Sequence, residues 1–128
     1  MQRKLIVAGA TVAALLTVTV TALAALPKKG GVYVGTVKSS PFEMAINLGV
    51  TPTGTKARFT YLCGTGRAPT VVFGVPIDSR GYFKYTKMTG SIVVWKMAGH
   101  FTSPTKAFVS LNSVACGGSK GSATLTLK

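Results

Sequence analysis

The sequence predicts one all-β domain behind an N-terminal export signal. From Gly31 onward, short runs rich in Val, Ile, Thr, Phe and Tyr alternate apolar with polar residues, and Gly, Pro, Ser and Lys separate the runs. Helix-forming residues are scarce in this part, and no helical period stands out. We expect a single antiparallel β-sandwich or small barrel of about eight strands, preceded by an N-terminal signal helix.

In the first half of the domain, four runs show the two-residue period of a strand. In residues 31–38, Val32 and Val34 fall on one face and Tyr33 and Val37 on the other. In the next three runs one face is apolar: Met44, Ile46, Leu48 and Val50 in 43–50, Phe59, Tyr61 and Cys63 in 56–63, and Val71, Phe73 and Val75 in 70–76. Lys56 and Arg58 fall on the other face of their run. One-sided alternation is typical of an antiparallel sheet with one face in water.

The second half continues the pattern after a turn at residues 78–81. The apolar faces are Phe83 and Tyr85, then Val93, Trp95, Met97 and Phe101, then Val109 and Leu111, and finally Ala123, Leu125 and Leu127. Tyr82, Lys84 and Lys96 lie on the opposite faces. Most aromatic residues are therefore expected in the core, and most basic residues in solvent. Short turns between the runs favour a meander.

The first segment has the three parts of a secretory signal. Arg3 and Lys4 form the charged start, and an uncharged stretch rich in Ala, Val, Leu and Thr follows. Ala22-Leu23-Ala24 then supplies the small residues that a signal peptidase accepts, with cleavage before Ala25. These features predict a secreted, extracellular protein.

A retained membrane anchor is the alternative. Residues 5–26 carry no charge over a length that spans a bilayer, although threonines dilute their hydrophobicity. The predicted organisation is a signal peptide at 1–24, a flexible lead-in at 25–30 and an all-β domain at 31–128. If the signal is not cleaved, residues 5–26 would hold the domain at the membrane.

The two cysteines of the mature chain, Cys63 and Cys116, are expected to form a disulfide. An exported chain meets an oxidising environment, and two cysteines allow only one intramolecular pairing. A free thiol and a metal site are the other interpretations. The metal site is disfavoured, because two distant cysteines and the single His100 do not have the spacing of a ligand cluster.

A strong positive charge distinguishes the mature chain. Without residues 1–24 it has 13 Lys and Arg residues against Glu43 and Asp78, a net charge of +11. Such a field attracts polyanions in general, so the expected partner is an anionic cell-envelope polymer or lipid surface. The candidate basic surface comprises Lys56, Arg58, Arg67, Arg80, Lys84, Lys87 and Lys96.

Specific nucleic-acid recognition is not expected. It needs aromatic and basic residues interleaved on one exposed face. The alternation instead puts Tyr61 opposite Arg58 and Trp95 opposite Lys96, and export removes the usual nucleic-acid targets. The alternative function is a protein-binding module or hydrolase inhibitor that acts through exposed loops, namely Ser39-Ser40-Pro41, Thr65–Pro69 and Ser103-Pro104.

The sequence offers no catalytic constellation, so we expect neither an enzyme nor a cofactor. Acid–base catalysis needs a positioned carboxylate, His or Lys. Glu43 starts a predicted strand, and Asp78 lies in a turn, where Asp commonly caps its own backbone. His100 lies between Gly99 and Phe101, on a face expected to be in solvent.

Several short motifs occur in a fixed order along the mature chain. They are Gly31-Val32-Tyr33-Val34-Gly35, a strand ending in Cys63, Ile77-Asp78-Ser79-Arg80-Gly81-Tyr82-Phe83, Gly99-His100-Phe101, Ala107-Phe108-Val109-Ser110-Leu111, and Cys116-Gly117. This order resembles a type of small β domain found in secreted proteins of Actinobacteria and related bacteria. The resemblance implies the fold, the disulfide and export, and it implies no activity. The chain departs from the pattern at Ala107, where glycine is usual, and in its last strand, which lacks an aromatic residue.

Overall fold

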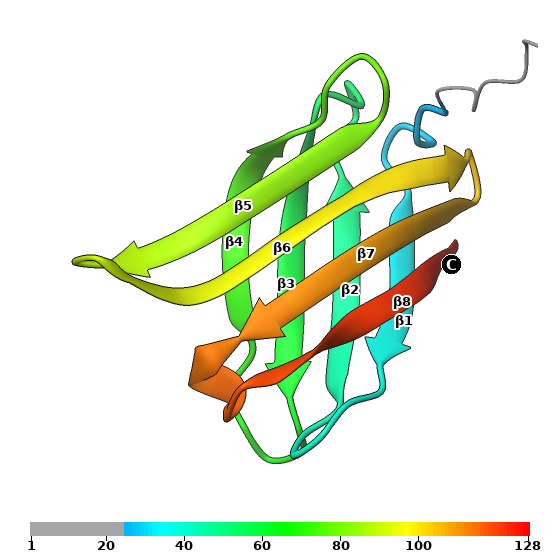
Figure 1. Ribbon diagram of the computed structural model, residues 1–128. Coiled ribbons are helices and arrows are strands. Elements are labelled where there is room, and N and C mark those ends of the chain that lie inside the picture. The colour runs from blue at the N-terminus through cyan, green and yellow to red at the C-terminus, as the bar shows by residue number, and fades with distance from the viewer. Residues whose placement is uncertain (1–24) are drawn as a thin grey trace, which may run out of the picture.

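The computed structural model describes residues 25–128 (Figure 1). The predicted signal peptide and its helix lie outside the described residues. The described part contains eight strands and one short 3-10 turn, η2. Their bounds are β1 Val32–Val37, β2 Met44–Val50, β3 Lys56–Cys63, β4 Thr70–Pro76, β5 Tyr82–Thr89, β6 Ile92–Ser103, β7 Lys106–Ser113, η2 Val114–Cys116 and β8 Ser119–Leu127. Within this part, no helix is long and apolar enough to cross a bilayer.

All eight strands belong to one antiparallel sheet with the order β4-β3-β2-β1-β8-β7-β6-β5. Neighbouring strands are consecutive in the chain except where β1 pairs with β8, through Tyr33 with Leu127 and Val34 with Thr126. Strands β5–β8 cross over β1–β4, so the sheet is nearly closed and barrel-like, with β4 and β5 at its two edges (Figure 1). The predicted all-β, antiparallel, eight-strand fold is confirmed.

The core lies between these two halves of the sheet. Trp95 on β6 is 4% exposed, and its ring centroid lies 5.8 Å from that of Phe59, 5.2 Å from Tyr61 and 5.1 Å from Tyr85. Phe59 and Tyr61 come from β3, whereas Tyr85 comes from β5. Trp95 therefore joins the two halves, and burying such large rings supplies much of the hydrophobic stabilisation.

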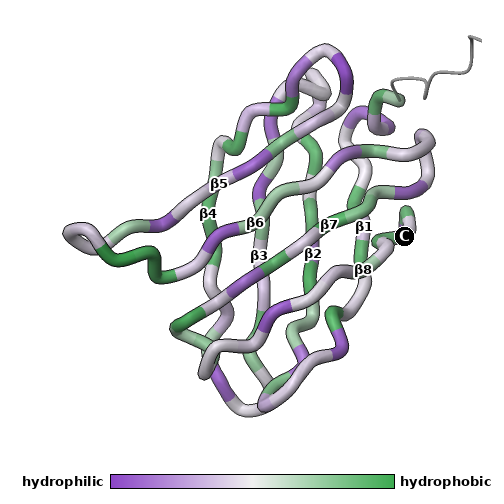
Figure 2. The backbone as a smooth tube through the Cα atoms, viewed as in Figure 1, coloured by the Kyte–Doolittle hydropathy of each residue, from purple (hydrophilic) through white to green (hydrophobic). Residues whose placement is uncertain are grey.

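Side-chain alternation along the strands agrees with the sequence pattern except in β4 and at the start of β6. In β6, Val94, and not the predicted Val93, packs against the core, because the register shifts opposite it. The residues predicted to share apolar faces, and found buried, include Tyr33, Val37, Met44, Ile46, Leu48, Val50, Phe59, Tyr61, Phe83, Met97, Phe101, Val109, Leu111 and Leu125. All 13 basic residues of the described part are exposed. Figure 2 shows the same pattern along the backbone, with hydrophobic and hydrophilic positions alternating in most strands.

Strand β4 departs from the prediction. Val75 is buried, whereas Val71 and Phe73 are 42% and 73% exposed. Opposite Arg58 the register of β4 shifts, and Gly74 there has a φ of 70°, which glycine adopts without strain. This β-bulge reverses the alternation, so Val71 and Phe73 point away from the core that Val75 faces.

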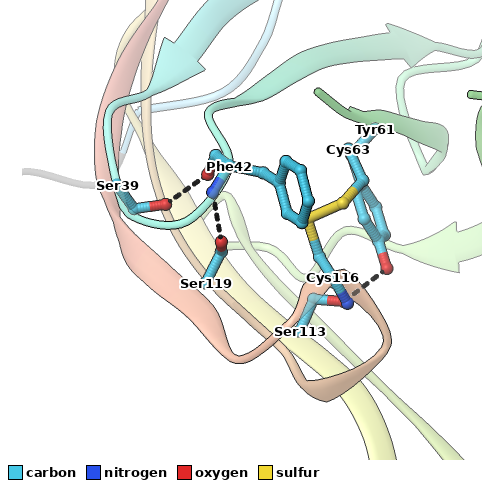
Figure 3. The surroundings of a disulfide bond; sticks show 7 residues. All are labelled: Ser39, Phe42, Tyr61, Cys63, Ser113, Cys116 and Ser119. Atoms are coloured by element: carbon cyan, nitrogen blue, oxygen red, sulfur yellow. Dashed lines mark hydrogen bonds between the residues drawn. A yellow bond between two sulfur atoms is a disulfide. The ribbon is translucent and has the colours of Figure 1, made fainter. Parts of the chain in front are cut away.

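The disulfide between Cys63 and Cys116 is present, with the two Cα atoms 5.7 Å apart (Figure 3). It ties the end of β3 to η2, between β7 and β8, and so links the two halves of the sheet. Beside it, the Tyr61 hydroxyl lies 2.8 Å from Ser113 Oγ, which accepts from the Cys116 N–H at 3.1 Å. Closing a loop over a sequence separation of 53 stabilises a fold by about 4 kcal/mol in the chain-entropy estimate.

The segment expected to be a flexible lead-in makes defined contacts with the domain. The Lys28 N–H donates to the Tyr33 hydroxyl at 2.8 Å, and the Gly31 N–H donates to the Lys28 carbonyl at 2.9 Å. The Gly30 N–H donates to the carbonyl of Thr51, just beyond β2, at 3.0 Å. These bonds place residues 28–31 at the end of the domain opposite the disulfide.

Candidate functional site

The molecule presents two outer sheet faces, because alternate side chains of every strand point away from the core. The first, which we call the β5–β8 face, contains four cross-strand rows: Lys106–Thr126, Tyr82–His100–Phe108–Thr124, Lys84–Ala98–Ser110–Ser122 and Thr86–Lys96–Asn112–Lys120. The second, the β1–β4 face, consists of Val32–Gly49–Arg58, Val34–Asn47–Thr60–Val71 and Thr36–Ala45–Leu62, with Lys56 and Phe73 at its edge.

The row of the β5–β8 face that begins at Tyr82 is aromatic. The rings of Tyr82 and His100 stack with centroids 4.8 Å apart and an interplanar angle of 16°. Phe108 follows at 6.0 Å from His100, and the Arg80 guanidinium lies 4.7 Å from the Tyr82 ring centroid. Arg80 and His100 therefore both pack against the Tyr82 ring. Tyr82 and Phe108 remain 44% and 38% exposed, so the row borders solvent along its length.

Asp78 holds the start of this row in place. Its Oδ1 accepts from the N–H groups of Arg80 at 2.8 Å and Tyr82 at 2.9 Å, and its Oδ2 lies 3.5 Å from the Arg80 guanidinium. The hydrogen bond from the Tyr82 N–H, then that from the Arg80 N–H, lowers the pKa of the Asp78 carboxyl below its ordinary value. Asp78 thus caps its turn as predicted, and both of its oxygens are engaged.

The next two rows combine lysines with small polar side chains. Lys96 and Lys120 lie in one row on β6 and β8, separated by β7, and therefore about 10 Å apart across the sheet. Lys84 lies in the row between these lysines and the aromatic row. No acidic residue occurs on β5, β6, β7 or β8. The carboxylate at the rim of this face, Asp78, is paired with Arg80. The lysines on the four strands therefore have no acidic neighbour in their own rows.

Two shallow depressions mark this face, each with a volume of about 630 Å³. The first is lined by Tyr82, His100 and Phe108, and the second by Lys96 and Lys120. They meet at three residues that line both, namely Lys84, Ala98 and Ser110. Together they form a groove whose floor consists of small side chains, with the aromatic row along one side and the lysine row along the other.

The predicted basic residues do not form one patch. Lys84 and Lys96 lie on the β5–β8 face and Arg80 at its rim, whereas Lys56 and Arg58 lie on the β1–β4 face. The other two lie elsewhere: Arg67, in the β3–β4 loop, packs over the Phe42 ring at 4.7 Å, and Lys87 lies near the end of β5, where the register shifts. Lys120, which completes the lysine row, and Lys106 were not among the predicted basic residues.

The loops considered for protein binding are separated as well. Loops 39–41 and 65–69 lie at the disulfide end, where the Phe42 N–H donates to Ser119 Oγ at 3.0 Å (Figure 3). The loop that contains Pro104 lies at the opposite end, where the Pro104 carbonyl accepts from the Tyr33 hydroxyl. No single loop surface contains all three segments.

The two acidic residues, Glu43 and Asp78, lie at opposite ends of the domain. Glu43 lies at the disulfide end, 4.0 Å from Lys38, whereas Asp78 lies at the opposite end, close to His100. The two carboxylates therefore do not form a pair. In the described part of the chain, no group of three or more His, Cys, Asp and Glu residues is arranged to hold a metal ion.

Comparison of the chain with protein-family models, with curated proteins and with solved structures found no match. The Cys63–Cys116 disulfide is consistent with an oxidising, extracellular location.

Proposed function

We propose that this protein is a secreted or envelope-associated, non-enzymatic domain that binds an anionic partner through the β5–β8 face. The observation that carries the proposal is the groove lined by Lys84, Lys96 and Lys120 on strands without a single acidic side chain. Like charges gathered on one face raise the local potential, and this increases both the affinity for polyanions and the rate of association with them.

The basic residues are arranged differently on the two faces of the molecule. On the β1–β4 face, Lys56 and Arg58 are neighbours on one strand, and the Arg58 guanidinium lies against β2: a Cβ on Gly49 would be 3.6 Å from its Nη2. The lysines of the β5–β8 face instead come from four strands, and Lys84, Lys96 and Lys120 border a depression. A flexible anionic polymer can therefore contact several of them at once.

A matched pair of double variants tests this proposal. Lys96→Ser with Lys120→Ser and Lys56→Ser with Arg58→Ser remove the same charge from opposite faces. Binding to immobilised heparin, a sulfated polyanion, is measured over a salt series. For the first variant we expect the slope of log affinity against log salt to fall by about 2. For the second variant we expect a clearly smaller change.

Equal losses of heparin affinity in the two double variants would show that the basic residues of both faces contribute alike. That result would overturn the assignment of binding to the β5–β8 face. Binding by the wild-type protein that does not depend on salt would overturn the electrostatic proposal as a whole.

A further inference from the structure

We infer that the groove of the β5–β8 face binds an acidic polysaccharide, a sugar polymer that carries carboxylate or phosphate groups. The inference rests on the proposed function and names the ligand class for the same site. The polymer would lie over Ala98 and Ser110, between the aromatic row and the Lys96–Lys120 row.

The hydrogen-bonding groups of the groove suit a ligand rich in hydroxyls. Ser110 and Ser122 lie side by side with their Oγ atoms 3.4 Å apart, and Thr86 and Asn112 lie in the next row. Hydroxyl and amide groups both donate and accept hydrogen bonds, as sugar hydroxyls do. Because Ala98 and the serines are small, a polymer can come close to the sheet and contact the lysines on both sides.

The aromatic row argues against single-stranded nucleic acid. Binding of that class depends on bases that stack on free aromatic faces. Here Arg80 and His100 already cover the Tyr82 ring, and His100 is itself stacked on Tyr82. Two of the three rings of the row are therefore already stacked on a partner.

The distribution of apolar side chains argues against a lipid surface at this groove. Insertion into a bilayer depends on exposed apolar groups. The large aliphatic ones on this side of the molecule are Met88 and Ile92, 45% and 64% exposed, at the tip of the β5–β6 hairpin, where Figure 2 shows hydrophobic colouring beside the turn. Tyr82 and Phe108, 44% and 38% exposed, lie beside His100 and border the groove on one side only. The middle of the β5–β8 face is lined by Ala, Ser, Asn and Lys.

Filling the groove without changing its charge tests the ligand class. Ala98→Tyr places a ring on the floor, and Ala45→Tyr is the control, an exposed alanine near the start of β2 on the β1–β4 face. The probes are polygalacturonate for carboxylated sugars, phosphomannan for phosphorylated sugars, poly(dT) for nucleic acid, and anionic vesicles containing phosphatidylglycerol. We expect Ala98→Tyr to lower the affinity for at least one of the two sugar polymers by about tenfold or more. Ala45→Tyr should leave the affinity for both polymers unchanged.

The two levels of the proposal fail differently. If Lys96→Ser with Lys120→Ser abolishes polygalacturonate and phosphomannan binding but Ala98→Tyr has no effect, the groove inference is wrong and the proposed function stands. If neither change has an effect, both are wrong. Tighter binding to poly(dT) or to vesicles than to either sugar polymer would also overturn the inference. Ser122→Leu, on β8, provides a second filling variant, with thermal melting to verify that each variant is folded.

Discussion

The two outer faces of this sheet follow the same alternation rule and carry charge of the same sign, yet they differ in what surrounds that charge. On the β1–β4 face, half-buried Val32, Val34 and Leu62 share the surface with the cations, and Phe73 is 73% exposed. On the β5–β8 face, the lysines stand among hydroxyl and amide side chains, above a floor of small residues. Net charge is therefore a poor guide to a binding surface, because the neighbours of each charge decide what it can contact.

The difference arises from local structure in two places. On β4, the bulge at Gly74 turns Phe73 outward and gives the β1–β4 face an apolar edge. At the start of β5, Asp78 caps the turn and fixes Arg80 against Tyr82. One turn thus orders an aromatic row that borders a groove, whereas one bulge leaves an exposed ring without such a row.

Breaking the disulfide should cause the largest loss of stability, and it should destabilise both halves of the sheet. Cys63→Ser with Cys116→Ser unties β3 from η2, and we expect it to lower the free energy of unfolding by about 2–5 kcal/mol. Urea unfolding of the variant and of the reduced wild-type protein checks this, and the two should agree. An unchanged midpoint in urea would show that the two halves of the sheet do not depend on this link.

Replacing Asp78 should cause a smaller loss of stability, because its contacts lie only on the β5–β8 side. The pKa of Asp78 is lowered in the folded protein, so its ionised form adds stability at pH values above its ordinary pKa of 3.8. That stability is lost as the pH falls through the folded-state pKa. We expect Asp78→Asn to melt below the wild-type protein at pH 6, with a gap that closes as the pH falls toward 2.

Arg80→Gln separates the two contributions to this pH dependence. It removes the guanidinium but keeps both backbone hydrogen bonds to Asp78, which are the larger causes of the lowered pKa. The pH dependence of melting should therefore largely persist in Arg80→Gln. A complete loss would show that the ion pair, and not the capped turn, stabilises the ionised carboxylate.

Local patterns were enough to predict the strands and much of the core. Met44, Ile46 and Leu48 alternate strictly, and their strand pairs in register with both neighbours. The prediction was wrong in β4, because a bulge depends on how the strand pairs with β3 and not on its own composition. The β1–β8 pairing that nearly closes the sheet joins residues far apart in sequence, which no local period reveals.

The candidate site was only partly predictable for the same reason. Tyr82, Lys84 and Lys96 were assigned to the solvent side by alternation, and His100 was expected in solvent. The row Tyr82–His100–Phe108, however, exists only because the registers of β5, β6 and β7 bring these positions side by side. A usable signal was present in the sequence, since aromatic residues occupy polar-side positions on three successive strands.

The central claim is that binding occurs on the β5–β8 face, and chemical-shift mapping tests it most directly. Titration of ¹⁵N-labelled protein with short polygalacturonate oligomers should shift the amide signals of Lys84, Ala98, Ser110 and Lys120 together, in a manner that salt reverses. The signals of the β1–β4 face, such as that of Arg58, should remain unchanged. Shifts centred on the β1–β4 face, or spread evenly over both faces, would contradict the account.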